Sequence, residues 1–330
     1  MHFRLLTAFV AIGTALMGGP SQAQKTFQDG YAGGDIAGLK PLKNSLNLLV
    51  VGDWGRAGEY RQREVATQMG KAAHTVEADF IVSTGDNFYP SGVASVQDPL
   101  WKRSFEDVYT AFSLQEEWYP VLGNHDYDGD AQAQIEYSRI SRRWRLPARY
   151  HHFERTTKDG TTVLFLFLDT NPFEKKYYRE DQGPFFRSNL ATGAADSLAQ
   201  KEWLLDVLQK SKARWKIVFG HHPLYSAGKR KGLTEDVASS LLPILVKGGA
   251  HLYVAGHEHQ LEHDVLEGGL HHFISGAGSE VRPVGGNALT RYVAAEHGFL
   301  SLSINREAVH CRFVNDSGRI VYDTRIPAGK

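Results

Sequence analysis

The sequence predicts an α/β (α+β) protein with two packed, mixed β-sheets and helices on their outer faces. Strand-like and helix-like segments alternate from residue 47 onward, and this alternation favours layered sheets and helices. Three consecutive strand patterns, at residues 299–304, 308–314 and 319–326, close the chain. Five apolar runs end at a glycine and are followed by a polar side chain, as expected where strand ends gather along one edge of a sheet.

Individual elements can be placed from their own signals. Residues 59–74 are expected to form a helix, and the continuous apolar run at residues 162–168 predicts a buried strand. Ser197 opens a Ser-Leu-Ala-Gln tetrapeptide that resembles a capping box, so we expect a helix to begin there. Thr234 is expected to cap a later helix that ends at a pair of glycines.

Composition and charge narrow the class of protein. The chain has 330 residues, 42% hydrophobic and 22% charged, which is typical of a globular protein with a large core. Its 37 basic and 37 acidic residues give zero formal net charge, so no nucleic-acid partner is expected. The single cysteine, Cys311, excludes an intrachain disulfide and a cysteine-based zinc site.

The N-terminal segment has the pattern of an export signal. Residues 1–23 combine a weakly basic start, an apolar stretch too short to span a bilayer comfortably, and small residues at the cleavage position. Residues 24–46, rich in glycine, are interpreted as a loose lead-in, and residues 47–330 as one catalytic domain. No later run is long enough for a membrane span. We therefore expect an exported protein, periplasmic or secreted.

The five glycine-ended runs carry the chemistry. Each is followed by side chains that can bind a metal: Asp53, Asp86, Asn124 with His125, His221 with His222, and His257 with His259. Tyr89 comes three residues after Asp86. Five such strand ends are hard to explain as ordinary turns. If the ends share one edge of a sheet, these side chains converge.

The donor atoms indicate the kind of metal site. Carboxylate, amide, imidazole and phenol donors without a thiolate suit iron, manganese or zinc. The set is too large for one metal and fits two, which in phosphoryl-transfer enzymes lie about 3.5–4 Å apart. One carboxylate must then bridge them. A phenolate is a hard anionic donor that selects a trivalent ion, so Tyr89 points to Fe(III).

The set resembles the purple acid phosphatases, within the calcineurin-like metallophosphoesterase superfamily. The five sequence blocks of that family are present in order, from Gly52-Asp53-Trp54-Gly55 to Gly256-His257-Glu258-His259. Most metallophosphoesterases have a histidine where Gly55 stands, and Tyr89 supplies the replacement that marks the purple type. The short chain is similar to the small, mammalian-type members, which implies a four-layer αββα sandwich.

The resemblance also implies the role of each ligand. Fe(III) would be held by Asp53, Asp86, Tyr89 and His259. A divalent iron, zinc or manganese ion would be held by Asp86, Asn124, His221 and His257. Asp86 would bridge the two ions, and an activated hydroxide would attack phosphorus in line. His125 would contact the phosphate or protonate the leaving alcohol.

One block departs from the family pattern. Small members usually carry a further histidine about nine residues after the His221 position, and here Arg230 stands near that place. An arginine can hold a phosphate bidentately but is a poor general acid. Our hypothesis is that Arg230, with Lys229, binds the substrate phosphate and that His125 alone serves as the acid. An exposed basic loop is the alternative. His222 is a weaker candidate for substrate contact.

Three functions remain open from the sequence. The first is an acid phosphomonoesterase acting on small phosphate esters or phosphorylated substrates. The second is a phosphodiesterase or phytase-like hydrolase on the same metals. The third is a redox-active di-iron protein, or a metal-binding protein without turnover.

Overall fold

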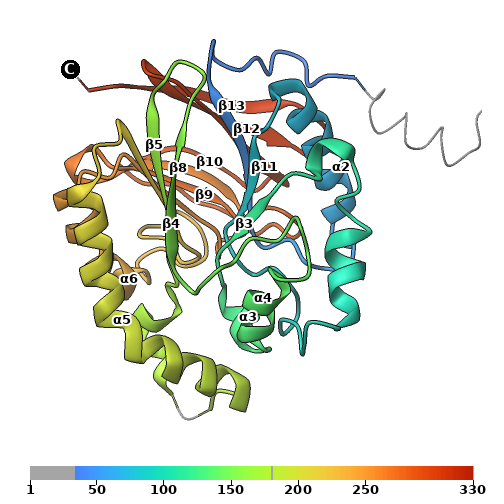
Figure 1. Ribbon diagram of the computed structural model, residues 1–330, viewed down its shortest axis with the longest axis vertical. Coiled ribbons are helices and arrows are strands. Elements are labelled where there is room, and N and C mark those ends of the chain that lie inside the picture. Colours follow the sequence, from blue (N-terminus) through green and yellow to red (C-terminus); the bar gives the residue numbers. More distant parts are fainter. Residues whose placement is uncertain (1–33, 180, 330) are drawn as a thin grey trace, which may run out of the picture.

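Two β-sheets lie face to face with helices outside them (Figure 1). A computed structural model describes residues 34–179 and 181–329. The six-stranded sheet has the order β13-β12-β11-β1-β2-β3, and its strands are β1 (Leu46–Val51), β2 (Phe80–Ser83), β3 (Trp118–Pro120), β11 (Gly298–Ile304), β12 (Ala308–Asn315) and β13 (Ile320–Pro327). The three expected C-terminal strands are therefore confirmed within one or two residues.

The seven-stranded sheet has the order β10-β8-β9-β7-β6-β5-β4. Its strands are β4 (His151–Thr156), β5 (Thr162–Phe167), β6 (Trp215–Phe219), β7 (Leu252–Ala255), β8 (Leu261–Val265), β9 (His271–Ser275) and β10 (Thr290–Ala294). Strands β5, β6, β7 and β9 are parallel, whereas β4, β8 and β10 pair antiparallel to their neighbours. Both sheets are mixed, as the sequence predicts.

Helices cover both outer faces. They are α2 (Gln62–Val76), α3 (Asn124–Tyr127), α4 (Ala131–Tyr137), α5 (Pro184–Lys210) and α6 (Glu235–Lys247). Shorter helical turns are η1 (Trp101–Glu106), η2 (Phe112–Leu114), η3 (Asn171–Phe173), η4 (Lys175–Tyr178) and η5 (Glu267–Gly269). Figure 1 shows α2 on one side of the sandwich and α5 with α6 on the other. The four-layer αββα arrangement is confirmed.

The alternation of side chains along β1 explains why its sequence is apolar throughout. Leu48 and Val50 pack into the cluster between the two sheets, with Phe165 and Ile217 of the other sheet. Leu49 and Val51 point to the opposite face, into the cluster beneath α2. Because successive side chains of a strand alternate between faces, a strand covered on both sides must be apolar at every position. A third cluster lies between the seven-stranded sheet and helices α5 and α6.

Two helix starts differ from the sequence expectation. Helix α2 begins at Gln62, because Tyr60 and Arg61 have left-handed φ values of 52° and 73° that no helix can include. The helix expected to start at Ser197 begins at Pro184 instead, and the Ser197 hydroxyl bonds back to the Ala194 carbonyl within α5. The expected capping box is therefore wrong.

The segment before β1 contacts the body of the protein. Ile36 and Leu39 belong to the buried cluster beneath α2, and the Leu42 amide donates to Ser303 of β11. The single-domain interpretation stays a prediction, and the expected export signal at residues 1–23 lies outside the described residues. Among the helices within residues 34–179 and 181–329, none has the length and apolar character needed to cross a membrane.

Candidate metal centre

Each sheet supplies part of one polar cluster at the ends of its parallel strands. Asp53, Asp86 and Asn124 follow β1, β2 and β3, which lie parallel in the six-stranded sheet. His221 and His257 follow β6 and β7, which lie parallel in the other sheet. Parallel strands present their C-terminal ends at one edge, where open sheets place their ligands. The cluster therefore lies where the two sheets meet.

The Tyr89 hydroxyl is the centre of the first group of donors. It lies 3.1 Å from Asp53 Oδ1, 2.9 Å from Asp86 Oδ2 and 3.3 Å from His259 Nε2. Asp53 Oδ1 and His259 Nε2 are 3.5 Å apart. These four side chains are almost completely buried. They are the four residues that the sequence resemblance assigns to one ion.

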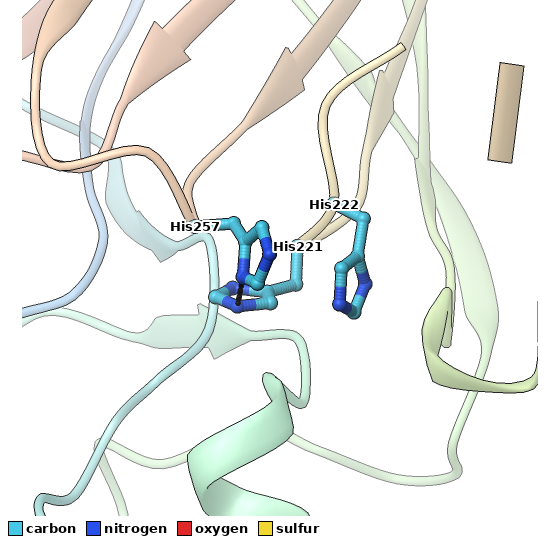
Figure 2. Close-up of side chains that lie close together, drawn as sticks. All are labelled: His221, His222 and His257. Atoms are coloured by element: carbon cyan, nitrogen blue, oxygen red, sulfur yellow. Dashed lines mark hydrogen bonds between the residues drawn. The ribbon is translucent and has the colours of Figure 1, made fainter. Parts of the chain in front are cut away.

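His221 Nε2 is the centre of the second group. It lies 3.0 Å from His257 Nδ1, 3.3 Å from Asn124 Oδ1 and 3.4 Å from Asp86 Oδ1. Figure 2 shows the His257 ring facing His221, with the His222 ring beside them. Asp86 thus presents Oδ2 to the first group and Oδ1 to the second, and this is the arrangement that a bridging carboxylate requires.

The spacing of the donors fits coordination. A cation held by bonds of about 2.0–2.2 Å keeps neighbouring donors about 3.0–3.5 Å apart at angles between a right angle and a tetrahedron. The contacts in both groups fall close to this range. His257 Nε2 is buried without a hydrogen-bond partner in the described part of the chain, whereas Nδ1 faces the second group. The residues therefore fit a pair of metal ions.

Burial makes Asp53, Tyr89 and His259 resist charging on their own. Burial, and next the charge of Asp86, raise the pKa of the Asp53 carboxyl well above its usual range. Burial and the same two carboxylates raise the pKa of the Tyr89 phenol. Burial, with Arg282 nearby, lowers the pKa of His259 to about 2. Because a cation favours carboxylate and phenolate, binding would offset the cost of charging Asp53 and Tyr89, whereas neutral His259 is already in the form that binds a metal.

Contacts behind the donors fix their orientation. The Nδ1 atom of His221 lies 2.8 Å from the Thr84 carbonyl, which can only accept, so Nδ1 carries the proton and Nε2 is left as the donor atom. The His257 amide donates to Asp53 Oδ2 at 2.9 Å. The His259 Nδ1 atom lies 3.6 Å from Glu280 Oε2. His221 thus turns Nε2 toward the cluster, whereas His259 Nδ1 has no hydrogen-bond partner among the described residues.

Gly55 explains why this chain uses Tyr89. A Cβ atom at Gly55 would lie only 2.5 Å from the carbonyl carbon of Asn87 and 2.8 Å from Phe88 Cα. The Tyr89 amide also donates to the Gly55 carbonyl at 2.9 Å. The loop that carries Tyr89 therefore occupies the space that a side chain at position 55 would need. The glycine at position 55 and the tyrosine at position 89 therefore belong to the same packing arrangement.

His125 lies at the open side of the cluster. Its ring is partly exposed and packs on the Tyr89 ring at 4.5 Å between centroids. Its Nδ1 atom lies 2.6 Å from the Pro90 carbonyl, so Nδ1 is the donor and Nε2 is left for other partners. Its amide donates to Asp86 Oδ1 at 2.9 Å. The backbone of His125 is thus fixed to the carboxylate that joins the two groups.

His222 is close to the cluster but engaged elsewhere. Its Nδ1 lies 2.7 Å from Thr170 Oγ1 and its Nε2 lies 2.8 Å from the Tyr177 hydroxyl. Its ring centroid is 4.4 Å from that of His257. Both ring nitrogens therefore have partners, although the ring forms part of the wall of the site.

Arg230 is held by a residue that the sequence reasoning missed. Its Nη1 donates to Glu258 Oε1 at 2.5 Å and to the His257 carbonyl at 3.0 Å. The Glu258 carboxylate is buried and also accepts from the Arg230 amide and from Ser226. The only sequence signal for Glu258 was its position between the two histidines of the last block. Arg230 is thus tied to the backbone of a proposed metal ligand.

Comparison with known proteins agrees with this geometry. Residues 46–261 match the family model described as calcineurin-like phosphoesterase. "Purple acid phosphatase 17" of Arabidopsis thaliana is 40% identical over 296 residues, covering 86% of each chain. "Tartrate-resistant acid phosphatase type 5" of Oryctolagus cuniculus is 34% identical over 307 residues, covering 86% of this chain and 91% of the relative.

A solved structure shares the fold across nearly the same length. "GAP50 the anchor in the inner membrane complex of Plasmodium" superposes with a TM-score of 0.75 and 26% identity, covering 87% of this chain and 90% of that one. The sequence relatives and the family model name phosphatases and phosphoesterases, and the two donor groups fit the metal centre of such proteins. This chain belongs to the purple acid phosphatase family of calcineurin-like phosphoesterases.

Proposed function

We propose that this protein is an acid phosphatase that hydrolyses phosphate monoesters at a dinuclear metal centre. The observation that carries the proposal is Asp86, which offers one carboxylate oxygen to each of two donor groups. Two relatives with 40% and 34% identity are named as acid phosphatases, which supports the same activity. Phosphate esters are therefore the substrate class.

We assign the two ions by the chemistry of their donors. Fe(III) would bind to Asp53, Asp86, Tyr89 and His259, because a phenolate favours a trivalent ion. A divalent iron, zinc or manganese ion would bind to Asp86, Asn124, His221 and His257. When bound, the pair would supply an activated hydroxide and neutralise the charge on the phosphoryl oxygens.

His125 is proposed as the general acid. The contact of Nδ1 with the Pro90 carbonyl leaves Nε2 as the ring nitrogen that can serve the substrate, and the residue is partly exposed. A protonated Nε2 can deliver its proton to the departing alcohol oxygen. The contact of the ring with Tyr89 and the hydrogen bond from the His125 amide to Asp86 keep this residue at a fixed place relative to the donor groups.

Arg230 is proposed to bind the substrate phosphate. Its Nη1 is occupied by Glu258 and His257, and the side chain keeps 23% of its surface exposed. The other edge of the planar guanidinium can therefore pair with phosphate oxygens. A contact between His222 and the substrate also stays a prediction; it would require the bond to Thr170 or to Tyr177 to open.

Export is a separate proposal that rests on the sequence of residues 1–23. A signal followed by a cleavage site would place the mature protein in the periplasm or outside the cell. Mass analysis of the protein purified after export should give a chain that begins near Gln24. An intact N-terminus on the exported protein would contradict this proposal.

The activity can be tested with purified, metal-loaded protein. We expect about two metal ions per chain, a visible absorption band, and hydrolysis of p-nitrophenyl phosphate that is favoured at acidic pH. Asp86→Asn should lose both ions and the activity. Tyr89→Phe should lose the visible band while the fold, followed by circular dichroism, is retained. A metal-free wild-type protein that remains fully active would overturn the proposal.

Two other functions are distinguished by the same assay. Cleavage of bis-p-nitrophenyl phosphate with little action on the monoester, between about pH 4 and pH 9, would favour a phosphodiesterase. The structural relative GAP50 is described as an anchor, so the fold can also serve a role other than turnover. A coloured protein without hydrolysis would favour a redox-active or purely metal-binding protein.

A further inference from the structure

The guanidinium of Arg56 lies close to the faces of two aromatic rings, one of them in the donor cluster. Its central carbon is 3.8 Å from the centroid of the Tyr89 ring and 4.9 Å from that of the Tyr60 ring. The side chain of Arg56 is only 17% exposed. A cation this close to a ring face is attracted to the negative π surface. The nearer ring is that of the proposed phenolate ligand.

The polar edge of Arg56 reaches two further parts of the same donor group. Its Nη2 pairs with Glu280 Oε2 at 2.8 Å, and this oxygen lies 3.6 Å from His259 Nδ1. Its Nε donates to Ser279 Oγ at 3.2 Å, and the Ser279 hydroxyl donates to the Asp53 carbonyl. One arginine is thereby connected to Tyr89 directly, and to His259 and Asp53 through one residue each.

The backbone around Arg56 is fixed as well. The buried side chain of Gln62 accepts from the Arg56 amide at 3.1 Å and from the Gly58 amide at 2.7 Å. The Ala57 amide donates to Ser104 Oγ at 3.0 Å. The loop from Arg56 to Gln62 is therefore held by hydrogen bonds from three successive amides. This loop holds the guanidinium at one place over the Tyr89 ring.

A fixed cation over a phenolate ring changes how strongly the oxygen donates to a metal. The positive charge lowers the energy of the ring electrons, so the phenolate becomes a weaker donor. It also offsets the negative charge of two carboxylates, because Asp53 Oδ1 and Asp86 Oδ2 lie 3.1 Å and 2.9 Å from the Tyr89 hydroxyl. Removing the charge should make the phenolate a stronger donor and stabilise the oxidised ion.

We propose that Arg56 is a positioning residue that holds the Tyr89 ring and sets its donor strength toward the trivalent ion. The inference rests on the proposed function, because it requires a metal at Tyr89. It concerns how Arg56 changes the donor strength of the Tyr89 phenolate, and it does not depend on the identity of the substrate. The same contact would keep the phenol side of the site rigid during turnover.

The visible spectrum of iron-loaded protein tests the proposal. We expect Arg56→Met to shift the phenolate-to-iron absorption band to longer wavelength and to make the iron harder to reduce. Arg56→Lys keeps a charge but loses the planar fork, so its band should lie between the two. Arg61→Met is the matched control, because Arg61 is half-exposed and pairs with Asp316 outside the cluster. Its band should remain that of the wild type.

Activity gives a second readout. We expect Arg56→Met to lower kcat with little change in KM, because Arg56 contacts the ligands and Arg230 is the proposed substrate contact. If Arg56→Met folds but retains no iron, the position of the absorption band in iron-loaded Arg56→Lys is the test of the inference. A band unchanged in Arg56→Lys, or in an iron-loaded Arg56→Met, would overturn the inference. A wild-type protein with bound iron but no visible band would instead overturn the metal assignment to Tyr89.

Discussion

Three of the seven proposed ligands have a backbone conformation that side chains rarely adopt. Asp53, Asp86 and His257 have φ values of 58°, 50° and 67°. Such conformations cost on the order of 1–3 kcal/mol each and persist where surrounding bonds determine them. Here the Asp53 amide donates to the Gly85 carbonyl, and the His257 amide to Asp53 itself. The strain is therefore part of how the donors are aimed.

The proposed ligands could be named from the sequence, but the residues that support them could not. Asp86 follows a short apolar run and a glycine, and these neighbours in the sequence are enough to mark it as a candidate metal ligand. Glu258 gave no such signal, because its role depends on residues 226–230 folding back over it. Arg56 likewise reaches Tyr89 only after two strand ends have come together. Local patterns predict donors, whereas tertiary contacts select what surrounds them.

Removing the side chain of Arg230 should weaken substrate binding more than it slows chemistry. We expect Arg230→Ala to raise KM for a phosphate monoester, and the inhibition constant of inorganic phosphate, about 10- to 100-fold, as for the loss of a charge-assisted hydrogen bond. Arg230→Lys should recover only part of this, since it lacks the planar fork. Lys231→Ala, in the same loop, is the control. Unchanged constants in Arg230→Ala would favour the exposed basic loop.

At the scale of elements, α5 shows why a helix start can be missed. The residues around Gly193 lack the spaced large apolar side chains that reveal a helix, so the sequence pattern begins only at the later leucines. In the fold, Phe186 and Leu190 are buried and extend the helix back to Pro184. A proline is well suited to the first turn. Packing of the N-terminal half therefore decides the start, not the apparent cap.

Ser197→Ala should consequently leave the protein as stable as the wild type or slightly more stable. Alanine is favoured over serine inside a helix by about 0.5 kcal/mol, whereas loss of a true N-cap costs about 1 kcal/mol. The melting temperature and the denaturant midpoint would separate the two cases. A clear loss of stability would restore Ser197 as a cap.

Strand β8 contains a buried carboxyl group with an unusual titration. Burial, and next the charge of Asp264, raise the pKa of Glu262 from 4.5 to about 9. The folded state therefore keeps a proton that the unfolded chain releases above pH 4.5. Stability should be highest at low pH and fall as pH rises toward 9, with a slope of up to about 1.4 kcal/mol per pH unit.

Glu262→Gln tests this slope directly. The amide is similar in shape and cannot ionise, so we expect the variant to lose that part of the decline and to be more stable than the wild type at about pH 8. Glu116→Gln, at an exposed position, should keep the wild-type slope. Urea unfolding measured from about pH 5 to pH 9 gives the comparison. Parallel slopes in all three proteins would contradict the raised pKa.

At the scale of the whole molecule, the layers were predictable and the strand order was not. The apolar runs show that strands such as β1 are covered on both faces, which requires a sandwich. The pairing of β1 with β11 joins residues from the two ends of the chain, Leu46 with Ile304. No local pattern encodes a partner at that distance. The resemblance to a family, and not periodicity, led to the four-layer arrangement.

Metal removal should destabilise the whole protein, because the ions would join residues from both sheets. A ligand at 100 times its dissociation constant adds about 2.7 kcal/mol of stability. We expect chelation to lower the melting temperature by about 5 °C or more, and metal addition to restore it. Asp86→Asn should melt at the same temperature with and without chelator. An unchanged wild-type melting temperature would indicate that the cluster does not hold ions.

The pairing of β1 with β11 also constrains when the catalytic centre can come into being during synthesis. Strand β1 leaves the ribosome long before β11, the strand that pairs with it on one side. Until β11 has been synthesised, Asp53 and Asp86 follow strands of an incomplete six-stranded sheet. The metal ions should therefore bind only after β11 has been synthesised, and a protein truncated at residue 297 should retain no stoichiometric metal.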